Sequence, residues 1–253
     1  MKLQVGLLGG GSWGTTVASL TAKNTKTIIW ARSQTTVDEI NNHHTNEKYL
    51  PNAKLTSSLI ASNSIKETVE NADVIVLGIP SQNMRKVLEE AKQYIRPWVP
   101  IINLAKGLEI STKMRMTEII EEIMPGHPAG VLTGPNLAKE SHFGNAAAAV
   151  IAMVDKSIAA RLQTVFSSGL FRVYTNTDVI GCELGGALKN IIAIGSGILG
   201  GLGMGKNIQA LLVTRGLVEM ITFGKVMGAS NRLRKFLLPI VGFKGVKGCS
   251  FQL

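Results

Sequence analysis

Short apolar runs alternate with amphipathic stretches of helical spacing from the N-terminus to Thr177. The apolar runs predict strands at residues 3–8, 27–32, 72–78, 99–104, 131–134, 147–154 and 171–174. The amphipathic stretches predict helices at residues 15–23, 34–42, 64–71, 84–94, 112–124 and 157–166, with a polar loop from the second helix to Leu55. Strands that alternate with helices are typical of α/β proteins with a doubly wound, mostly parallel sheet.

The pattern changes after Thr177, where residues 178–205 and 207–228 read as two long helices rich in Ala, Gly, Leu and Ile. We therefore expect an α/β domain over residues 1–177 and a partial all-helical domain over residues 178–253. Residues 190–205 carry no charge, but the stretch is short and rich in glycine, so we interpret it as a buried helix and not a membrane span. Earlier in the chain, Ser64 and Glu67 have the spacing of a helix capping box.

The first predicted strand runs into a G-x-G-x-x-G sequence formed by Gly9, Gly11 and Gly14, and a predicted helix follows. A strand, a glycine turn and a helix in this order form the context that the dinucleotide-binding fingerprint requires. The three glycines allow a tight turn, close approach of a pyrophosphate, and close packing of helix on strand. The pyrophosphate then faces the free N–H groups of the helix N-terminus. The sequence predicts a Rossmann-type, dinucleotide-binding domain, against the alternative of an ordinary glycine-rich loop.

Arg32 follows the second predicted strand, about twenty residues beyond the glycines, where NAD-selective sites place Asp or Glu. An arginine there can pair with a 2′-phosphate, which favours NADP over NAD. The alternative is a solvated arginine on a turn.

Two lysines are candidates for the chemistry. Lys106 directly follows a predicted buried strand, at the sheet edge where α/β proteins bind ligands, together with Gly134 and Asn136. Lys189 lies inside an apolar helix, where a lysine either lines a site or extends to solvent. For Lys106 a surface position is an equal alternative, and for Lys189 taken alone the solvent position is favoured.

Charge and cysteine content narrow the function further. The net charge is +10, but five of the basic residues lie beyond residue 229, where no acid occurs: Arg232, Arg234, Lys235, Lys244 and Lys247. No nucleic-acid-binding motif accompanies this charge, so we do not expect a nucleic-acid partner. The four histidines have no metal-ligand spacing, and Cys182 and Cys249 form no disulfide framework, which fits a reducing cytoplasm. The first predicted strand starts too early to leave room for a signal peptide.

Seven ordered motifs give the chain a resemblance to a known family. They are residues 9–15 (GGGSWGT), 30–32 (WAR), 105–109 (AKGLE), 133–140 (TGPNLAKE), 171–176 (FRVYTN), 183–190 (ELGGALKN) and 214–217 (TRGL). Together they closely resemble bacterial-type NAD(P)-dependent sn-glycerol-3-phosphate dehydrogenase over residues 2–229. A hydroxyacid or ketopantoate-type reductase is an alternative that the contexts of Lys106 and Lys189 disfavour.

The resemblance implies that NAD(P)H reduces dihydroxyacetone phosphate reversibly to sn-glycerol 3-phosphate, which feeds phospholipid synthesis. It also implies the role of each site residue. Ser12, Trp13, Arg32 and Ala138 would contact the nucleotide, and Lys106 would lie between nicotinamide and substrate. Gly134 and Asn136 would lie near the substrate, and Lys189 would donate and accept the proton. A lysine close to another cation, and partly desolvated, has a lowered pKa that suits this role.

The sequence departs from the family after residue 229. Relatives continue with a Gly-Asp segment and a Ser-Arg-Asn segment that holds the substrate phosphate, and we find neither here. The basic tail from about residue 230 reads like a frameshifted or alternatively encoded end of a truncated domain. Besides the enzyme, the sequence therefore leaves open a remnant that binds NAD(P) without turnover, and the tail favours little or no reduction by this chain. We expect a small phosphorylated partner and no membrane insertion; the sequence allows a homodimer and does not determine the oligomeric state.

Overall fold

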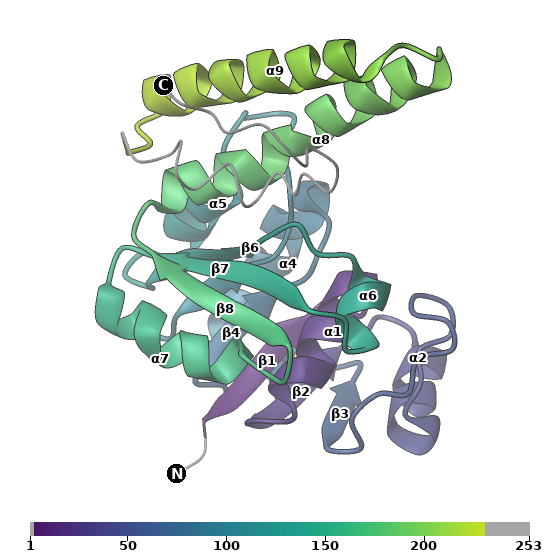
Figure 1. Cartoon of the computed structure of the whole chain (residues 1–253). Helices are drawn as coiled ribbons and strands as arrows, with labels where there is room; N and C mark the ends of the chain where they lie inside the picture. Colours follow the sequence, from purple (N-terminus) through teal and green to yellow (C-terminus); the bar gives the residue numbers. More distant parts are fainter. Residues whose placement is uncertain (1–2, 231–253) are drawn as a thin grey trace.

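The computed structural model describes residues 3–230 and contains one eight-stranded sheet in that range (Figure 1). The strands are β1 (Gln4–Leu8), β2 (Lys26–Trp30), β3 (Leu59–Ser62), β4 (Val74–Leu77), β5 (Ile101–Asn103), β6 (Ala129–Thr133), β7 (Ala147–Met153) and β8 (Phe171–Asn176). Their order across the sheet is β3-β2-β1-β4-β5-β6-β7-β8, and every pair is parallel except β6 with β7. The first six strands follow the order of a Rossmann fold. The predicted fold class is confirmed.

Helices cover both faces of the sheet. They are α1 (Ser12–Thr21), α2 (Gln34–Asp38), α3 (Ile65–Val69), α4 (Met84–Ala91), α5 (Met116–Ile123), α6 (Ala138–His142), α7 (Lys156–Phe166), α8 (Val179–Gly201) and α9 (Lys206–Val226), with a π-helix at Glu39–His43 and 3-10 turns at Ser81–Asn83 and Lys92–Tyr94. One core cluster joins the sheet to α1 and α7, and a second joins the other face to α3, α4 and α5. This two-faced burial explains why the central strands read as continuous apolar runs.

Several details differ from the sequence predictions. β3 and α6 lie in stretches for which the sequence predicts no element. The helix predicted from residue 112 begins instead at Met116, because Lys113 adopts a left-handed φ of 64° that a helix cannot contain. The capping box is half right: Ser64 accepts a hydrogen bond from the Glu67 N–H, but the Glu67 carboxylate accepts one from Ser62 and not from the Ser64 N–H.

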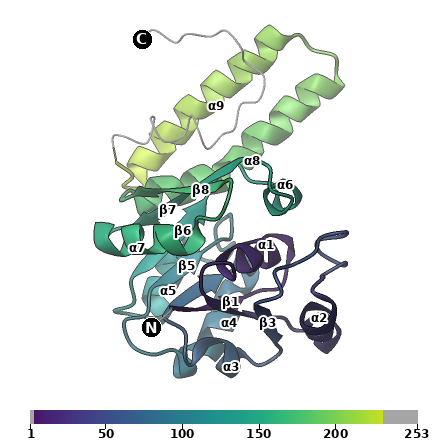
Figure 2. The ribbon, with the colours of Figure 1, turned by 60° about the horizontal axis from the view of Figure 1, so that its bottom comes forward.

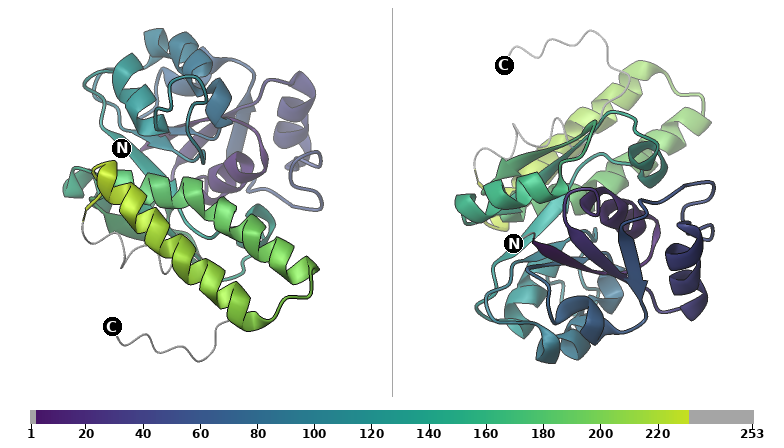
Figure 3. Two further views of the ribbon diagram at one scale, coloured as in Figure 1. Left: turned by 90° about the horizontal axis from the view of Figure 1, so that it is seen from above. Right: turned by 90° about the horizontal axis from the view of Figure 1, so that it is seen from below.

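The two long predicted helices form an antiparallel hairpin that extends beyond the sheet (Figure 2 and, from above and below, Figure 3). The first turns of α8 pack on β6 and β7, where Val179 and Cys182 are buried with Val131 and Ala152. The expected burial of residues 190–205 is wrong. Only Ile192 is buried in that stretch, because α9 covers one side of α8 and nothing among the described residues covers the other.

α8 is long and apolar enough, by length and composition alone, to cross a membrane. A little under half of its most apolar window is buried inside the protein, and core helices of soluble proteins pass the same test. The absence of membrane insertion stays a prediction. The predicted basic tail and Cys249 lie outside the described residues.

Candidate active site

The glycine turn joins β1 to α1 through close backbone contacts. Gly9 has a left-handed φ of 125°. A Cβ there would come within 2.4 Å of the carbonyl oxygen of Gly78, the residue that follows β4. A Cβ on Gly14 would lie 2.0 Å from the Gly9 carbonyl oxygen, so the helix can approach the strand only without a side chain. Gly11 is the helix N-cap, and a Cβ there would meet no atom within 4 Å. The turn thus leaves a cradle open at the N-terminus of α1, which suits a pyrophosphate.

A cleft of about 840 Å³ opens over this turn. It lies at the carboxyl ends of the strands, on either side of β1, where the chain order in the sheet reverses. The predicted nucleotide residues line it together: Gly9, Gly11, Ser12, Trp13, Gly14, Arg32 and Lys106. Asn46 fixes the loop above the turn, because its buried amide donates hydrogen bonds to the Gly10 carbonyl and the Thr15 hydroxyl.

Arg32 lies at the wall of this cleft, two residues beyond the end of β2. Its side chain is exposed and forms no ion pair with any residue between 3 and 230. Lys48 and Lys86 line the same cleft, with Glu90 as an acidic neighbour on α4. The cleft therefore offers several cations, and Arg32 has its guanidinium available for an anionic ligand such as a phosphate.

A smaller chamber of about 250 Å³ adjoins the cleft, and Trp13, Leu104 and Lys106 line both. Its other lining residues include the predicted Gly134, Asn136 and Ala138, together with Thr133. The Thr133 hydroxyl and the Asn136 amide nitrogen are buried and have no hydrogen-bond partner among residues 3–230. Buried polar groups are almost always satisfied, so these two atoms fit a chamber that receives a polar ligand.

Lys189 lies beside Lys106, although the two residues are far apart in the sequence. Lys106 extends from the end of β5, and Lys189 projects from the middle of α8, where it is half-buried. Burial among the cleft walls, and then the neighbouring Lys189, lower the pKa of Lys106 to about 8. The Lys106 side chain is exposed and lines both cavities. The pair concentrates positive charge where the two chambers meet.

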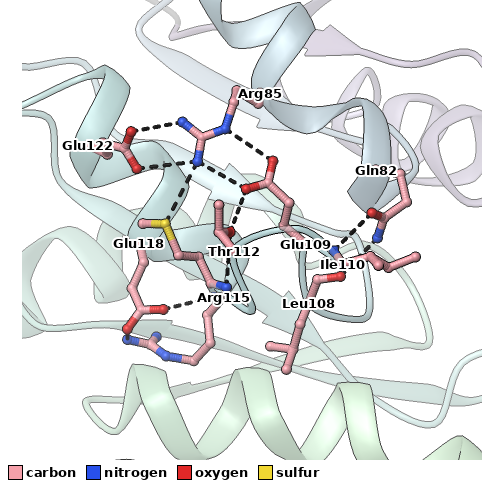
Figure 4. Close-up of polar contacts among 10 residues, drawn as sticks. Gln82, Arg85, Leu108, Glu109, Ile110, Thr112, Arg115, Glu118 and Glu122 are labelled. Carbon is pink, nitrogen blue, oxygen red and sulfur yellow. Dashed lines mark hydrogen bonds and ion pairs between the residues drawn. The ribbon is translucent and has the colours of Figure 1, made fainter.

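The loop that carries Lys106 is fastened to α4, a feature that sequence reasoning missed (Figure 4). Gln82 donates a hydrogen bond to the Leu108 carbonyl and accepts one from the Ile110 N–H. Arg85 binds Glu109 with two hydrogen bonds of 3.1 and 3.0 Å and also pairs with Glu122 on α5. The Arg85 guanidinium and the Thr112 hydroxyl hold the pKa of Glu109 below its usual value. Pairings between distant residues leave no local pattern in the sequence, so nothing there pointed to Arg85.

Sequence reasoning also passed over a buried ion pair at the start of α8. The Glu183 carboxylate lies 3.0 Å from the Arg115 guanidinium, and both side chains are almost fully buried. Glu183 also accepts hydrogen bonds from the Thr117 N–H and hydroxyl, which ties α8 to the first turn of α5. Burial raises the pKa of Glu183, and the bonds from Thr117 and Arg115 oppose that rise. A glutamate in an otherwise apolar helix was the available signal, since Glu is rarely buried without a partner.

Two family models match this chain. The model for the N-terminal part of NAD-dependent glycerol-3-phosphate dehydrogenase matches residues 4–159, and the model for its C-terminal part matches residues 178–243. The second match extends past residue 229, where the resemblance in the sequence was expected to end.

Curated relatives agree with the family models. A glycerol-3-phosphate dehydrogenase [NAD(P)+] of Sphingopyxis alaskensis is 57% identical over 228 residues, which are 90% of this chain and 68% of the relative. The enzyme of the same name from Mycobacterium avium is 50% identical over 228 residues, which are 90% of this chain and 67% of the relative. The chain therefore spans about two thirds of the length of these relatives.

Solved structures show the same fold. The crystal structure of glycerol-3-phosphate dehydrogenase from Coxiella burnetii matches with a TM-score of 0.87 at 33% identity, over 95% of this chain and 73% of that one. A ketopantoate reductase from Ralstonia eutropha matches with a TM-score of 0.66 at 16% identity, over 93% of this chain and 79% of that one, which is a likeness of fold alone. With the glycine turn, the cleft and the paired lysines in place, these matches show that the chain belongs to the NAD-dependent glycerol-3-phosphate dehydrogenase family.

Proposed function

We propose that this chain binds NADPH, or NADH less well, in the larger cleft and interconverts dihydroxyacetone phosphate and sn-glycerol 3-phosphate at the smaller chamber. The main support for this proposal is that Lys106 lines both cavities and lies beside Lys189. A site that joins a dinucleotide to a small substrate needs cationic side chains at such a junction, because negative charge develops on the substrate oxygen during reduction. Curated relatives are named for this activity, and their names include both NAD and NADP as cofactors.

The residues of the larger cleft fit a dinucleotide. Gly9, Gly11 and Gly14 leave backbone space for the pyrophosphate, and Ser12 and Trp13 begin the helix that faces it. Arg32 would pair with the 2′-phosphate at the far end of the cleft. Ala138 would contact the nicotinamide end from the smaller chamber. When bound, the nicotinamide supplies the hydride; the protein has to position it and stabilise charge.

The smaller chamber would hold the three-carbon substrate. Asn136 and the Gly134 backbone line it, and the Asn136 amide nitrogen is free to donate a hydrogen bond to a substrate oxygen. Lys106 would hold a substrate oxygen electrostatically. Lys189 would give a proton to the oxygen that becomes the product hydroxyl, and would take it back in the reverse direction. The charge of Lys189 adds to the effect of burial in favouring loss of a proton from Lys106.

The wider setting follows from the same proposal. The substrate partner is a small phosphorylated molecule, and the product would supply phospholipid synthesis in the cytoplasm, where the free, buried Cys182 would stay reduced. We propose a dinucleotide-binding part up to Thr177 and a helical part from Asp178 on. Exposed apolar residues of α8 and α9 favour self-association, with a homodimer as the simplest closed form.

The second candidate is a chain that binds NADPH without turnover. One observation favours it: the outer faces of α8 and α9 are apolar and exposed.

One experiment separates the two candidates. NADPH is titrated into the purified 253-residue protein by fluorescence, and its oxidation is then followed at 340 nm with and without dihydroxyacetone phosphate. The enzyme gives saturable binding and substrate-dependent oxidation, whereas the second candidate gives binding alone. Failure to bind NADPH would contradict both.

A further inference from the structure

The residue that immediately organises the Lys106 backbone is Asn103, at the end of β5. Its side chain is fully buried. The carboxamide oxygen accepts a hydrogen bond of 2.8 Å from the Ala105 N–H, and the carboxamide nitrogen donates one of 3.0 Å to the Ala105 carbonyl. Both polar groups of Ala105, the residue before Lys106, are therefore bound by one side chain.

The same carboxamide nitrogen also reaches the helical part of the chain. It lies 3.4 Å from a carboxylate oxygen of Glu183 on α8. That oxygen also accepts the Thr117 N–H, while the second oxygen accepts the Thr117 hydroxyl and Arg115. The four groups that contact this carboxylate are all donors, so both of its oxygens are bound.

The helix α8 carries both Glu183 and Lys189 on one continuous stretch. They are six positions apart in the sequence, which corresponds to about 9 Å along the helix axis. Asn103 is therefore bonded on one side to the loop of Lys106 and on the other to the helix of Lys189. Arg115 also binds Glu183 and pairs with Leu108 in an isolated β-bridge, but among residues 3–230 only the Asn103 side chain hydrogen-bonds both Ala105 and Glu183.

We propose that Asn103, held by Glu183, is a positioning residue that sets Lys106 against Lys189. It touches neither substrate nor cofactor, and it acts through the Ala105 backbone. The clamp of Arg85 and Gln82 holds the far end of the same loop but has no link to α8 (Figure 4). Asn103 is thus the point at which the sheet and α8 are brought into register at the site. This inference rests on the proposed roles of the two lysines.

The pKa of the Lys106 amine reports this placement directly. Lys189 on α8 is the charged group that lowers it, and Arg32, Lys48, Lys86 and Glu90 are the other charged residues lining the cleft. Glu183 and Arg115 neutralise one another behind Asn103. If the loop loses Asn103, Lys106 gains solvent and distance from Lys189, and both changes raise its pKa.

The test is competitive acetylation of the full chain with acetic anhydride over a range of pH, with Lys106 followed by peptide mass spectrometry. The wild-type amine is expected to titrate at about 8. Asn103→Ala should raise that value by about 1–2 pKa units toward that of an ordinary lysine. The matched control is Thr117→Val, which removes a neighbouring buried bond to Glu183 but leaves Asn103 and Ala105 bonded. It should lower the melting temperature and leave the Lys106 titration unchanged.

A second variant guards against simple loss of structure. Asn103→Ser keeps an oxygen that can accept the Ala105 N–H but is too short to reach Glu183, so an intermediate rise is expected. A folded Asn103→Ala protein, judged by its thermal transition, in which Lys106 still titrates at about 8 would overturn the proposal. Failure of both variants to fold would also overturn it, because Asn103 would then be required for the fold and not for placement. Acetylation requires no turnover, so an inactive chain leaves the test intact, whereas a wild-type Lys106 with an ordinary pKa would contradict the proposed lysine pair itself.

Discussion

At the scale of single residues, the cationic side chains of this protein fall into two groups, those that line the cavities and those that pair with carboxylates. Arg32 and Lys106 both face cavities, and neither forms an ion pair with an acidic residue in the described part of the chain. By contrast, Arg85 and Arg115 form ion pairs with carboxylates and so connect different elements of the fold. This division separates cations available for ligands from cations that stabilise structure.

The first prediction concerns cofactor choice. Arg32→Asp should weaken NADPH binding by about ten- to a hundredfold, because one charge-assisted contact to the 2′-phosphate is lost and a repulsive one replaces it. NADH, which lacks that phosphate, should lose much less. Fluorescence titration of both cofactors measures the two dissociation constants. Arg161→Asp, on the exposed face of α7, makes the same charge change away from the cleft and should affect neither cofactor. Equal losses for both cofactors in Arg32→Asp would show that Arg32 does not bind the 2′-phosphate.

The second prediction concerns the proton. Lys189→Ala should lower turnover by about 10²–10⁴-fold and leave NADPH affinity nearly unchanged, because the larger cleft does not include Lys189. Turnover is followed by NADPH oxidation at 340 nm, and affinity by fluorescence. Lys225→Ala, an exposed lysine of α9, is the matched control and should behave as wild type. Near-normal turnover in Lys189→Ala would remove this residue from the mechanism.

At the scale of elements, the turn from β1 into α1 makes two demands on its glycines that can be separated. Gly14 is needed for packing, since a Cβ would collide with the Gly9 carbonyl oxygen. At Gly11 a Cβ would meet no atom and the backbone is ordinary and extended, so packing does not require a glycine there. We therefore expect Gly11 to be needed for the ligand and Gly14 for the fold.

The third prediction uses this contrast. Gly11→Ala should shift the melting temperature by no more than about 2–4 °C, yet weaken NADPH by about tenfold or more because the methyl group occupies the pyrophosphate cradle. Gly14→Ala should lower the melting temperature markedly, because backbone must move to relieve the contact. Thermal unfolding monitored by circular dichroism, with and without NADPH, measures both effects. The interpretation fails if Gly11→Ala binds NADPH as tightly as the wild type.

Elements with strong local periodicity could be predicted from the sequence, and elements defined by tertiary contacts could not. The β1 run, the glycine turn and α1 are local features and occur in the predicted order, although α1 spans Ser12–Thr21 and not the predicted residues 15–23. β3 was missed because its apolar run, residues 59–61, is only three residues long and is flanked by serines. The proximity of Lys106 and Lys189 follows from how α8 docks on the sheet, so only the family resemblance could point to it.

At the scale of the whole molecule, the helical hairpin carries an apolar surface that the described residues do not cover. Ile191, Ile194 and Ile198 on α8 and Leu202 just after it are 57–71% exposed. Leu211 and Val226 on α9 are 62% and 80% exposed. Contiguous apolar surface on a soluble protein marks an interaction site or a tendency to aggregate. The charged, doubly wound part of the molecule has no comparable feature of its own among the helices that cover its sheet.

The fourth prediction is that the protein self-associates through this surface. The double variant Ile194→Lys with Ile198→Lys should lower the associated fraction and leave the melting temperature within about 2–4 °C of wild type, because both side chains are exposed. Sedimentation velocity over a range of concentrations measures association. A matched double substitution of Lys156 and Arg161 by Gln on α7 should leave association unchanged. A wild-type protein that stays monomeric throughout this range would contradict the prediction.

The central claim is that the junction of the two cavities transfers a hydride from NADPH to the ketone carbon of dihydroxyacetone phosphate. The most direct measurement uses NADPH that carries deuterium at both C4 positions of the nicotinamide, incubated with the full chain and dihydroxyacetone phosphate. Product analysis by mass spectrometry detects even slow turnover. We predict sn-glycerol 3-phosphate with one deuterium on C2, formed by the wild type and strongly reduced in Lys189→Ala. Absence of deuterated product above the protein-free reaction, from a protein that binds NADPH, would contradict the claim.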